Sequence, residues 1–249
     1  MSDSLTRVRV KRISFEADSI NSYELISPDG GDLAPFTAGS HIDLHLPNGM
    51  IRSYSLVNDQ SERNRYLIAV NNDAASRGGS KMIHETMRVG DVLTISHPRN
   101  NFVLQEDADH SVLIAGGIGI TPLFSMIRRL EALGRSWELF YAARTQLTAA
   151  FLAELKNLRP DIDPKLHLNF DGEPPAHMID LSAIVKAAAP DAHLQARATH
   201  ASICHIPHRK PPAYQDRNRG IRDAARSRAI HRSVSRFRGW PKASSSMKL

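Results

Sequence analysis

The stretch "SVLIAGGIGITPLFSMIRRLEALG", residues 111–134, decides the fold of the second half of this chain. A compact apolar run is followed by a glycine-rich turn and then by leucines and isoleucines that recur at helical spacing from Leu123 to Leu133. Gly134 stands where such a helix is expected to end. Strand, tight turn and helix in this order are typical of sheets with parallel strands, so the stretch predicts an α/β domain.

The turn itself has the composition of an anion site. Gly116, Gly117 and Gly119 allow a sharp turn and a close approach of a ligand to the main chain. Thr121 is predicted to cap the helix, and Pro122 to take its first position. A helix start presents unpaired N–H groups, which favours the pyrophosphate of a dinucleotide. The GxGxxG pattern is not matched, and a tight turn without a ligand remains the alternative.

The segments that follow continue the alternation of strands and helices. "WELFYAAR" and "KLHLNF" are predicted strands, and "AAFLAELKNL" and "LSAIVKAAA" are predicted helices. This order implies parallel pairing through right-handed crossovers. We therefore expect a nucleotide-binding α/β domain over residues 107–194.

Residues 7–105 have a different pattern. "HIDLHL", "RYLIAVNN" and "DVLTISHP" are predicted strands separated by turn residues, with one short helix in "SRGGSKMIHETM". Several short strands with one small helix predict a closed or nearly closed antiparallel barrel. The domain boundary is expected near residue 106.

The predicted strand "RSYSLVND", residues 52–59, places a cation and an aromatic ring, Arg52 and Tyr54, on one face. Gly78, Gly79 and Ser80 open the short helix and are suited to bind a phosphate, to which Arg52 can donate two hydrogen bonds. A solvated strand face and an ordinary glycine-serine turn are the alternatives. Two phosphate sites with an aromatic platform between them fit a flavin on the barrel that faces a nicotinamide on the sheet.

Charge is unevenly distributed along the chain. Residues 195–249 contain 13 Lys and Arg against 2 Asp and Glu, whereas residues 1–194 contain 19 against 24, although the whole chain has a net charge of +6. The basic segment has one leucine and one valine, so we expect it to be disordered. A nucleic-acid-binding arm is the alternative, and it is disfavoured because the segment has no repeated motif and the rest of the chain is acidic.

Other residue types exclude several classes of protein. The single cysteine, Cys204, excludes a disulfide within the chain, and also a 2Fe-2S cluster, which takes about four cysteine ligands. No apolar run reaches the roughly 20 residues of a membrane span and no secretory signal is present, so we expect a cytoplasmic protein with no membrane partner. His41, His45 and His84 are expected to be surface or hydrogen-bonded residues, and no metal site is predicted.

The motifs "RSYSLVND", "NRYLIAV", "SRGGS", "PRNNF" and "AGGIGITPLFSM" resemble, in order and spacing, those of ferredoxin reductase-like flavoproteins. The likeness covers about residues 5–194 and is greatest to the reductases of phthalate dioxygenase and vanillate demethylase systems. It implies an all-β Greek-key flavin-binding barrel over residues 1–106, followed by a parallel-sheet NAD-binding domain over residues 107–194.

The resemblance also implies roles for individual residues. Ser55 and Thr121 would lie at the reacting rings and are the catalytic candidates. The implied cofactor-binding residues are Arg52, Tyr54, Ser55, Leu56, Ala69, Val70, Asn71, Gly78, Gly79, Ser80, Gly116, Gly117, Gly119, Thr121 and Pro122. FMN is the implied flavin, with FAD as the alternative. NADH is the implied co-substrate, although the only nearby charge expected after "LFYAAR" is Arg144, whose role is ambiguous.

The implied function is that of an NADH-dependent flavin oxidoreductase, the reductase component of a Rieske-type aromatic oxygenase or demethylase system. Its electrons would pass to an iron-sulfur acceptor on the oxygenase component or on a separate ferredoxin. After Leu194 the chain lacks the cysteine-glycine-proline turn and the cluster cysteines of such relatives. We therefore expect a truncation or a shifted reading frame there, an incomplete sheet with an unpaired edge, and weaker NADH binding. An inactive flavin-binding fragment is the alternative.

Overall fold

The computed structural model describes residues 5–73, 76–158, 165–173, 179–189 and 192–198, and the basic segment after residue 198 lies outside them. The barrel part contains β1 (Leu5–Ala17), β2 (Ile20–Ile26), β3 (His41–His45), β4 (Ile51–Ser55), β5 (Tyr66–Asn71), α1 (Gly79–Thr86) and β6 (Val92–Ser96). The α/β part contains β7 (His110–Gly116), η1 (Gly117–Gly119), α2 (Ile120–Ala132), β8 (Ser136–Ala143), η2 (Gln146–Thr148), α3 (Leu152–Asn157), β9 (Lys165–Phe170), α4 (Leu181–Ala187) and β10 (His193–Ala198). Within these ranges no helix is long and apolar enough to span a membrane.

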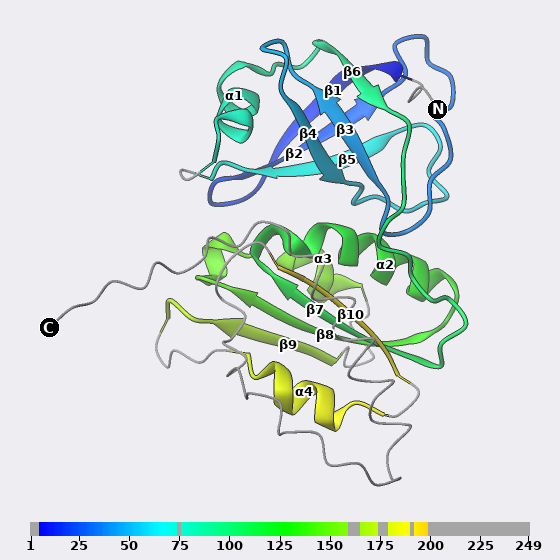
Figure 1. Ribbon diagram of the computed structural model, residues 1–249, viewed down its shortest axis with the longest axis vertical. Coiled ribbons are helices and arrows are strands. Elements are labelled where there is room, and N and C mark those ends of the chain that lie inside the picture. The colour runs from blue at the N-terminus through cyan, green and yellow to red at the C-terminus, as the bar shows by residue number, and fades with distance from the viewer. Residues whose placement is uncertain (1–4, 74–75, 159–164, 174–178, 190–191, 199–249) are drawn as a thin grey trace, which may run out of the picture. The chain divides into compact units, whose positions relative to one another are not determined.

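The first six strands form one antiparallel sheet in the order β4-β3-β6-β1-β2-β5 (Figure 1). Its two end strands meet just beyond β4, where Leu56 forms a bridge with Ile68 and the Val57 N–H donates to Leu67 O at 2.8 Å. The contact brings the ends of the sheet together. Because β6 lies between β3 and β1, the strand order is of the Greek-key type. The predicted all-β barrel is confirmed.

Strands β7 to β10 form a parallel sheet in the order β10-β7-β8-β9. Helices α2 and α3 cover one face and α4 covers the other (Figure 1). The alternation along β7 explains this arrangement, because Leu113 and Ala115 pack in the core with α2, while Val112 and Ile114 pack with Ile184 of α4. The predicted α/β domain is confirmed.

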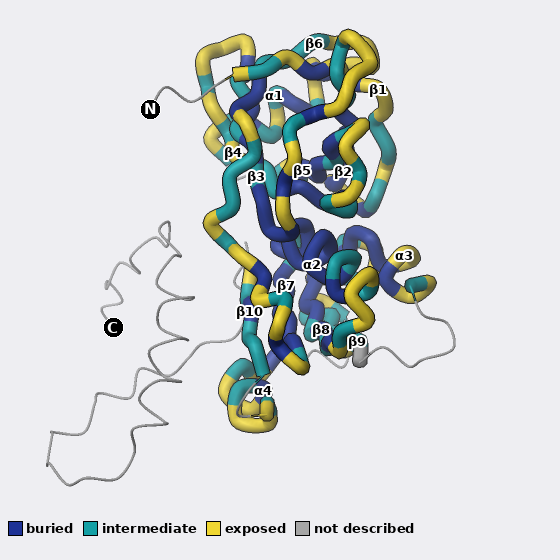
Figure 2. The backbone as a smooth tube through the Cα atoms, turned by 90° about the vertical axis from the view of Figure 1, so that its right-hand side faces the viewer, coloured by how far each residue is buried: buried dark blue, intermediate teal, exposed yellow. Residues whose placement is uncertain are grey.

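The first two turns of helix α2, residues 120–127, are buried on all sides rather than on one face, and this part of the tube is dark blue (Figure 2), whereas the rest of the helix is mostly half-buried or exposed. Its sheet-facing residues were predicted from the helical repeat. Its other side packs on the barrel, because one core cluster contains α2 residues such as Leu123 and Met126 together with Ile20 and Val57 of the barrel part. Leu133, by contrast, follows the helix and is exposed.

The predicted start of α2 was wrong by two residues. The one-turn helix η1 precedes α2, so α2 begins at Ile120 with Gly119 at its N-cap, and no side chain caps it. Thr121 lies inside the first turn and donates from Oγ1 to Ile118 O at 3.0 Å. Pro122 is therefore the third helical residue, where its missing N–H group still costs nothing because the first four helical N–H groups have no partner within the helix.

Strand β10 crosses residue 194, at which the sequence motifs were expected to end. Gln195 to Ala198 continue the parallel pairing with β7, and the Gln195 side chain is buried and donates to Val103 O at 2.8 Å. The end of β10 also presses on Gly119, where an added Cβ atom would lie 2.3 Å from Arg197 O. No strand within the described ranges pairs with the other edge of β10.

Gly119→Ala is expected to lower the free energy of unfolding by about 1–3 kcal/mol, because the new methyl group would displace the backbone of β10. Gly119 has an ordinary helical φ of −61°. Alanine would therefore stabilise the protein by about 0.4–1 kcal/mol if β10 were not docked there. Urea denaturation shows whether Gly119→Ala lowers or raises the free energy of unfolding. Gly31→Ala is the control, because Gly31 has open space around it.

Candidate functional site

Four residues from two distant segments come together beside the barrel, and we call Arg52, Gly78, Gly79 and Ser80 the Arg52 cluster. An added Cβ atom at Gly79 would lie 2.6 Å from Arg52 Nε and 2.9 Å from its Cγ. The absence of a side chain at Gly79 thus lets the Arg52 side chain lie against the start of α1. The predicted meeting of the arginine strand with the glycine-serine turn is present in the structure.

The Arg52 cluster has hydrogen-bonding groups without protein partners. Among the described residues Ser80 Oγ is buried and unpaired, and α1 has no side-chain cap. The first N–H groups of a helix have no acceptor within the helix, and those of α1 belong to the same segment as Ser80. Arg52 donates only to Ile51 O at 2.9 Å and to Met50 Sδ at 3.1 Å, and no described carboxylate pairs with it. This combination of donors is suited to a phosphate.

His84 holds α1 against β5. Its Nε2 lies 2.9 Å from Val70 O and its Nδ1 lies 3.4 Å from Asn21 Nδ2. A carbonyl oxygen accepts and an amide nitrogen donates, so the neutral tautomer with the proton on Nε2 satisfies both contacts. His84 is hydrogen-bonded, as predicted, and it fixes the distance between the Arg52 cluster and β5.

The predicted ring-binding residues lie on β4, β5 and the segment after β4, and they point in different directions. Tyr54 is half-buried against the barrel core, and this burial raises the pKa of its phenol to about 12, so it stays neutral. Leu56 and Val70 have their side chains inside the barrel core, so only their backbone atoms can line a site. Ala69 faces the opposite way, into the cluster that contains α2. Ser55 and Asn71 are half-buried.

The glycine turn after β7 uses each glycine differently. Gly117 has φ +53°, in the left-handed region that favours glycine. Gly116 is extended, and Gly119 is the point where β10 approaches most closely. This turn, η1, contacts β5 of the barrel. The structure thus brings the Thr121 segment near the β5 residues expected to bind the ring.

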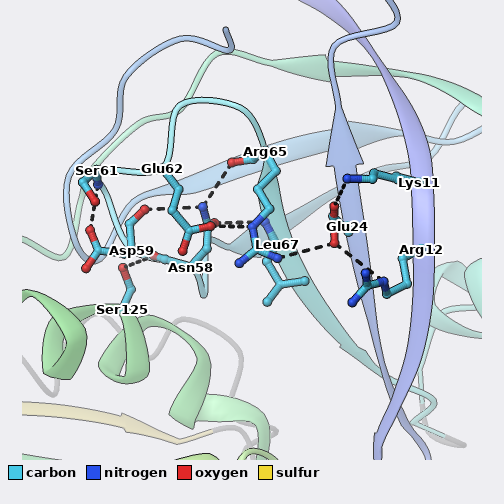
Figure 3. A network of polar contacts seen from close by, with 10 residues as sticks. All are labelled: Lys11, Arg12, Glu24, Asn58, Asp59, Ser61, Glu62, Arg65, Leu67 and Ser125. Atoms are coloured by element: carbon cyan, nitrogen blue, oxygen red, sulfur yellow. Dashed lines mark hydrogen bonds and ion pairs between the residues drawn. The ribbon is translucent and has the colours of Figure 1, made fainter. Parts of the chain in front are cut away.

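Asn58, the seventh residue of "RSYSLVND", organises the loop between β4 and β5 (Figure 3). Its Oδ1 accepts from the Leu67 N–H at 2.9 Å, and its Nδ2 donates to Arg65 O at 3.1 Å. Its backbone oxygen accepts from Ser125 Oγ of α2 at 3.1 Å, and both residues are buried. This hydrogen bond joins the segment that follows the Tyr54 strand, β4, to the helix that carries Thr121.

A buried carboxylate, Glu24, braces the neighbouring strands in the same view (Figure 3). Its oxygens lie 3.1 Å from Lys11 Nζ and 3.4 Å from Arg65 Nη1. Burial alone would raise the pKa of Glu24, but the hydrogen bond and charge of Lys11, with the charges of Arg65 and Arg12, lower it overall. Glu24 therefore stays ionised and links β1 and β2 to Arg65, the residue just before β5.

Comparison with known proteins shows which families and structures this chain resembles. Residues 113–207 match the family described as the oxidoreductase NAD-binding domain. Tetrachlorobenzoquinone reductase of Sphingobium chlorophenolicum is 51% identical over 182 residues, which cover 73% of this chain and 56% of that protein. Vanillate O-demethylase oxidoreductase of a Pseudomonas species (strain HR199 / DSM 7063) is 42% identical over 190 residues, 76% of this chain and 59% of that protein.

Among solved structures, the chain is similar to phthalate dioxygenase reductase, described as a modular structure for electron transfer from pyridine nucleotides to a 2Fe-2S centre. The TM-score is 0.72 and the identity 38%, over 78% of this chain and 60% of that one. The chain belongs to the ferredoxin reductase-like flavoproteins. It spans 56% and 59% of the lengths of the two relatives named above.

In this ferredoxin reductase-like chain, the residues present fit a flavin phosphate. The buried, unpaired Ser80 Oγ and the close approach at Gly79 are the structural features expected of a site built around an anion. Sequence reasoning missed Asn58, Ser125 and His84 as organisers of the site. Asn58 and Ser125 belong to two of the quoted motifs, but they lie 67 positions apart, so no local pattern reveals their contact.

Proposed function

We propose that this chain is the NADH-dependent flavin oxidoreductase of a Rieske-type aromatic oxygenase or demethylase system. The single observation that carries the proposal is the Arg52 cluster, in which a half-buried guanidinium, an uncapped helix start and the unpaired Ser80 Oγ converge. Support also comes from the match to an oxidoreductase NAD-binding domain and from relatives named as reductases of oxygenase and demethylase systems.

FMN is the flavin that these residues fit best. Arg52 would donate to the phosphate together with Ser80 Oγ and the first N–H groups of α1. Tyr54 would pack on the ring plane, Ser55 would donate to the ring near its reactive nitrogen, and Ala69, Val70 and Asn71 would line its pyrimidine edge. When bound, the flavin supplies the conversion of a two-electron hydride donor into single electrons.

NADH would bind at the carboxyl edge of the parallel sheet. Gly116, Gly117, Gly119 and Pro122 would shape the backbone around the dinucleotide, and Thr121 would reach the nicotinamide or the flavin. The contact of η1 with β5 and the Asn58–Ser125 hydrogen bond support this proposal, because they would keep the two proposed binding surfaces close together. Proximity of this kind is the main contribution a protein makes to hydride transfer between two bound rings.

Electrons would then pass to an iron-sulfur centre held outside these 249 residues, which contain one cysteine. The oxygenase component or a separate ferredoxin is the proposed partner. The relatives share the reductase role, whereas their names point to different aromatic or alcohol substrates. We therefore assign the choice of aromatic substrate to the oxygenase component.

An absorbance spectrum of the purified chain tests the proposed function. We expect flavin bands, release of FMN rather than FAD on heating, and bleaching of the bands when NADH is added without oxygen. An artificial acceptor should then restore the colour repeatedly. A colourless chain that does not take up added FMN would refute the proposal, and a yellow chain that NADH never bleaches would reduce it to flavin binding alone.

A further inference from the structure

The turn that follows β9 is fixed against the end of β8 by three successive hydrogen bonds. The Asp171 N–H donates to Ala143 O at 3.2 Å, and the Gly172 N–H donates to Arg144 O at 2.7 Å. The Gln146 N–H donates to Glu173 Oε1 at 2.7 Å. These contacts place the Glu173 carboxylate at the carboxyl end of β8, next to residues 144–146.

Gly172 makes this close arrangement possible. An added Cβ atom would lie 2.5 Å from Arg144 O and 3.0 Å from Arg144 Cγ, so a side chain at this position would push the two turns apart. Glu173 Oε2 has no hydrogen-bond partner among the described residues. The turn therefore presents a half-buried carboxylate with one oxygen anchored and the other available.

The position of the Glu173 carboxylate relative to the proposed nucleotide site follows from the order of the strands. Strand β8 lies next to β7, whose glycine turn is the proposed pyrophosphate site. In nucleotide-binding sheets the adenosine ribose lies over the end of the strand after the glycine turn, where an acidic side chain accepts from the 2′-hydroxyl of NAD and a basic one accommodates the 2′-phosphate of NADP. Arg144, at the end of β8 itself, would by this rule favour NADPH.

We propose that Glu173, supplied by the neighbouring β9 turn, selects NADH over NADPH. This inference rests on the proposed function. The carboxylate accepts from the ribose 2′-hydroxyl through Oε2 and repels a 2′-phosphate, and its charge offsets that of the exposed Arg144 beside it. Glu173 is a specificity residue for the dinucleotide and takes no part in the transfer of the hydride.

Glu173→Gln isolates the charge, because the glutamine oxygen can still accept from the Gln146 N–H. The test is the ratio of the affinities for 5′-AMP and for adenosine 2′,5′-bisphosphate, which differ only in the 2′-phosphate, measured by calorimetry on the flavin-loaded chain. We expect Glu173→Gln to shift this ratio about tenfold toward the bisphosphate, corresponding to a like-charge repulsion of about 1.4 kcal/mol. The ratio of kcat/KM for NADPH and NADH should shift by a similar factor.

Asp109→Asn is the matched control, because it removes one negative charge just before β7. Asp109 lies at the amino ends of the parallel strands, whereas Glu173 lies at their carboxyl ends. It should leave both ratios unchanged. An unaltered ratio in Glu173→Gln, with 5′-AMP and NADH still bound, would overturn the inference and leave the proposed function standing. A wild-type chain that binds neither NADH nor 5′-AMP would overturn both.

Discussion

Replacing Arg52 with glutamine is expected to weaken FMN binding roughly 10- to 150-fold, the equivalent of losing about 1.5–3 kcal/mol from hydrogen bonds between a guanidinium and a phosphate. The arginine is well placed for this role because Gly79 leaves room for it beside the start of α1. Its present partners are a neighbouring carbonyl and a thioether, so its removal costs the fold little.

Fluorescence titration of the flavin-free chain with FMN measures the affinity directly. Arg7→Gln, which removes an exposed arginine from β1 of the same barrel, is the control and should bind FMN like the unmodified chain. The melting temperature of the flavin-free Arg52→Gln variant should stay within about 1 °C of the wild type, whereas added FMN should raise it less. Equal FMN affinity in Arg52→Gln and wild type would remove the Arg52 cluster as a phosphate site.

Gly39→Ala is expected to lower the free energy of unfolding by about 2–5 kcal/mol. Gly39 has φ +92°, and an added Cβ atom would lie 2.0 Å from Phe102 O and 2.7 Å from Met126 Cε. The left-handed backbone costs an alanine about 1–2 kcal/mol, and the clash adds about 1–3 kcal/mol because the turn would be pushed by both Phe102 and Met126 of α2.

Gly90→Ala separates these two costs, because Gly90 has a similar φ of +98° and open space around it. We expect it to lose only the backbone contribution, about 1–2 kcal/mol. Urea denaturation of the two variants gives the difference between their free energies of unfolding. This difference is the steric cost of the contact of Gly39 with Phe102 and with Met126 of α2. Equal losses would show that this contact is not tight in solution.

Much of the fold followed from local patterns. Alternating apolar and polar residues in "HIDLHL" predicted β3, the apolar repeat predicted α2, and Gly134, which adopts φ +65°, marked the end of that helix as expected. These features are readable because strand and helix periodicity and the φ preferences of glycine act over a few residues. The start of α2 was misplaced because η1 adds a turn that neither Thr121 nor Pro122 signals.

The candidate site was predicted as a set of residues, but not as a geometry. The sequence alone indicated that Arg52, Tyr54 and the glycine-serine turn have the side chains and backbone groups needed to bind one ligand. The sequence did not indicate that the side chains of Leu56 and Val70 lie inside the barrel core, nor that the Asn58 backbone oxygen accepts a hydrogen bond from Ser125. Such directions depend on which strands pair and at what register.

By itself, the sequence determined an antiparallel barrel followed by a parallel sheet, with a phosphate-type turn in each, because periodicity, glycine placement and charge are encoded locally. Only the tertiary structure decided that α2 is buried on both sides, that Gly79 makes room for Arg52, and that Glu173 lies beside Arg144 at the end of β8. Each of these arrangements depends on contacts between residues more than 25 positions apart, where no local preference acts and only the packing of whole elements brings the side chains together.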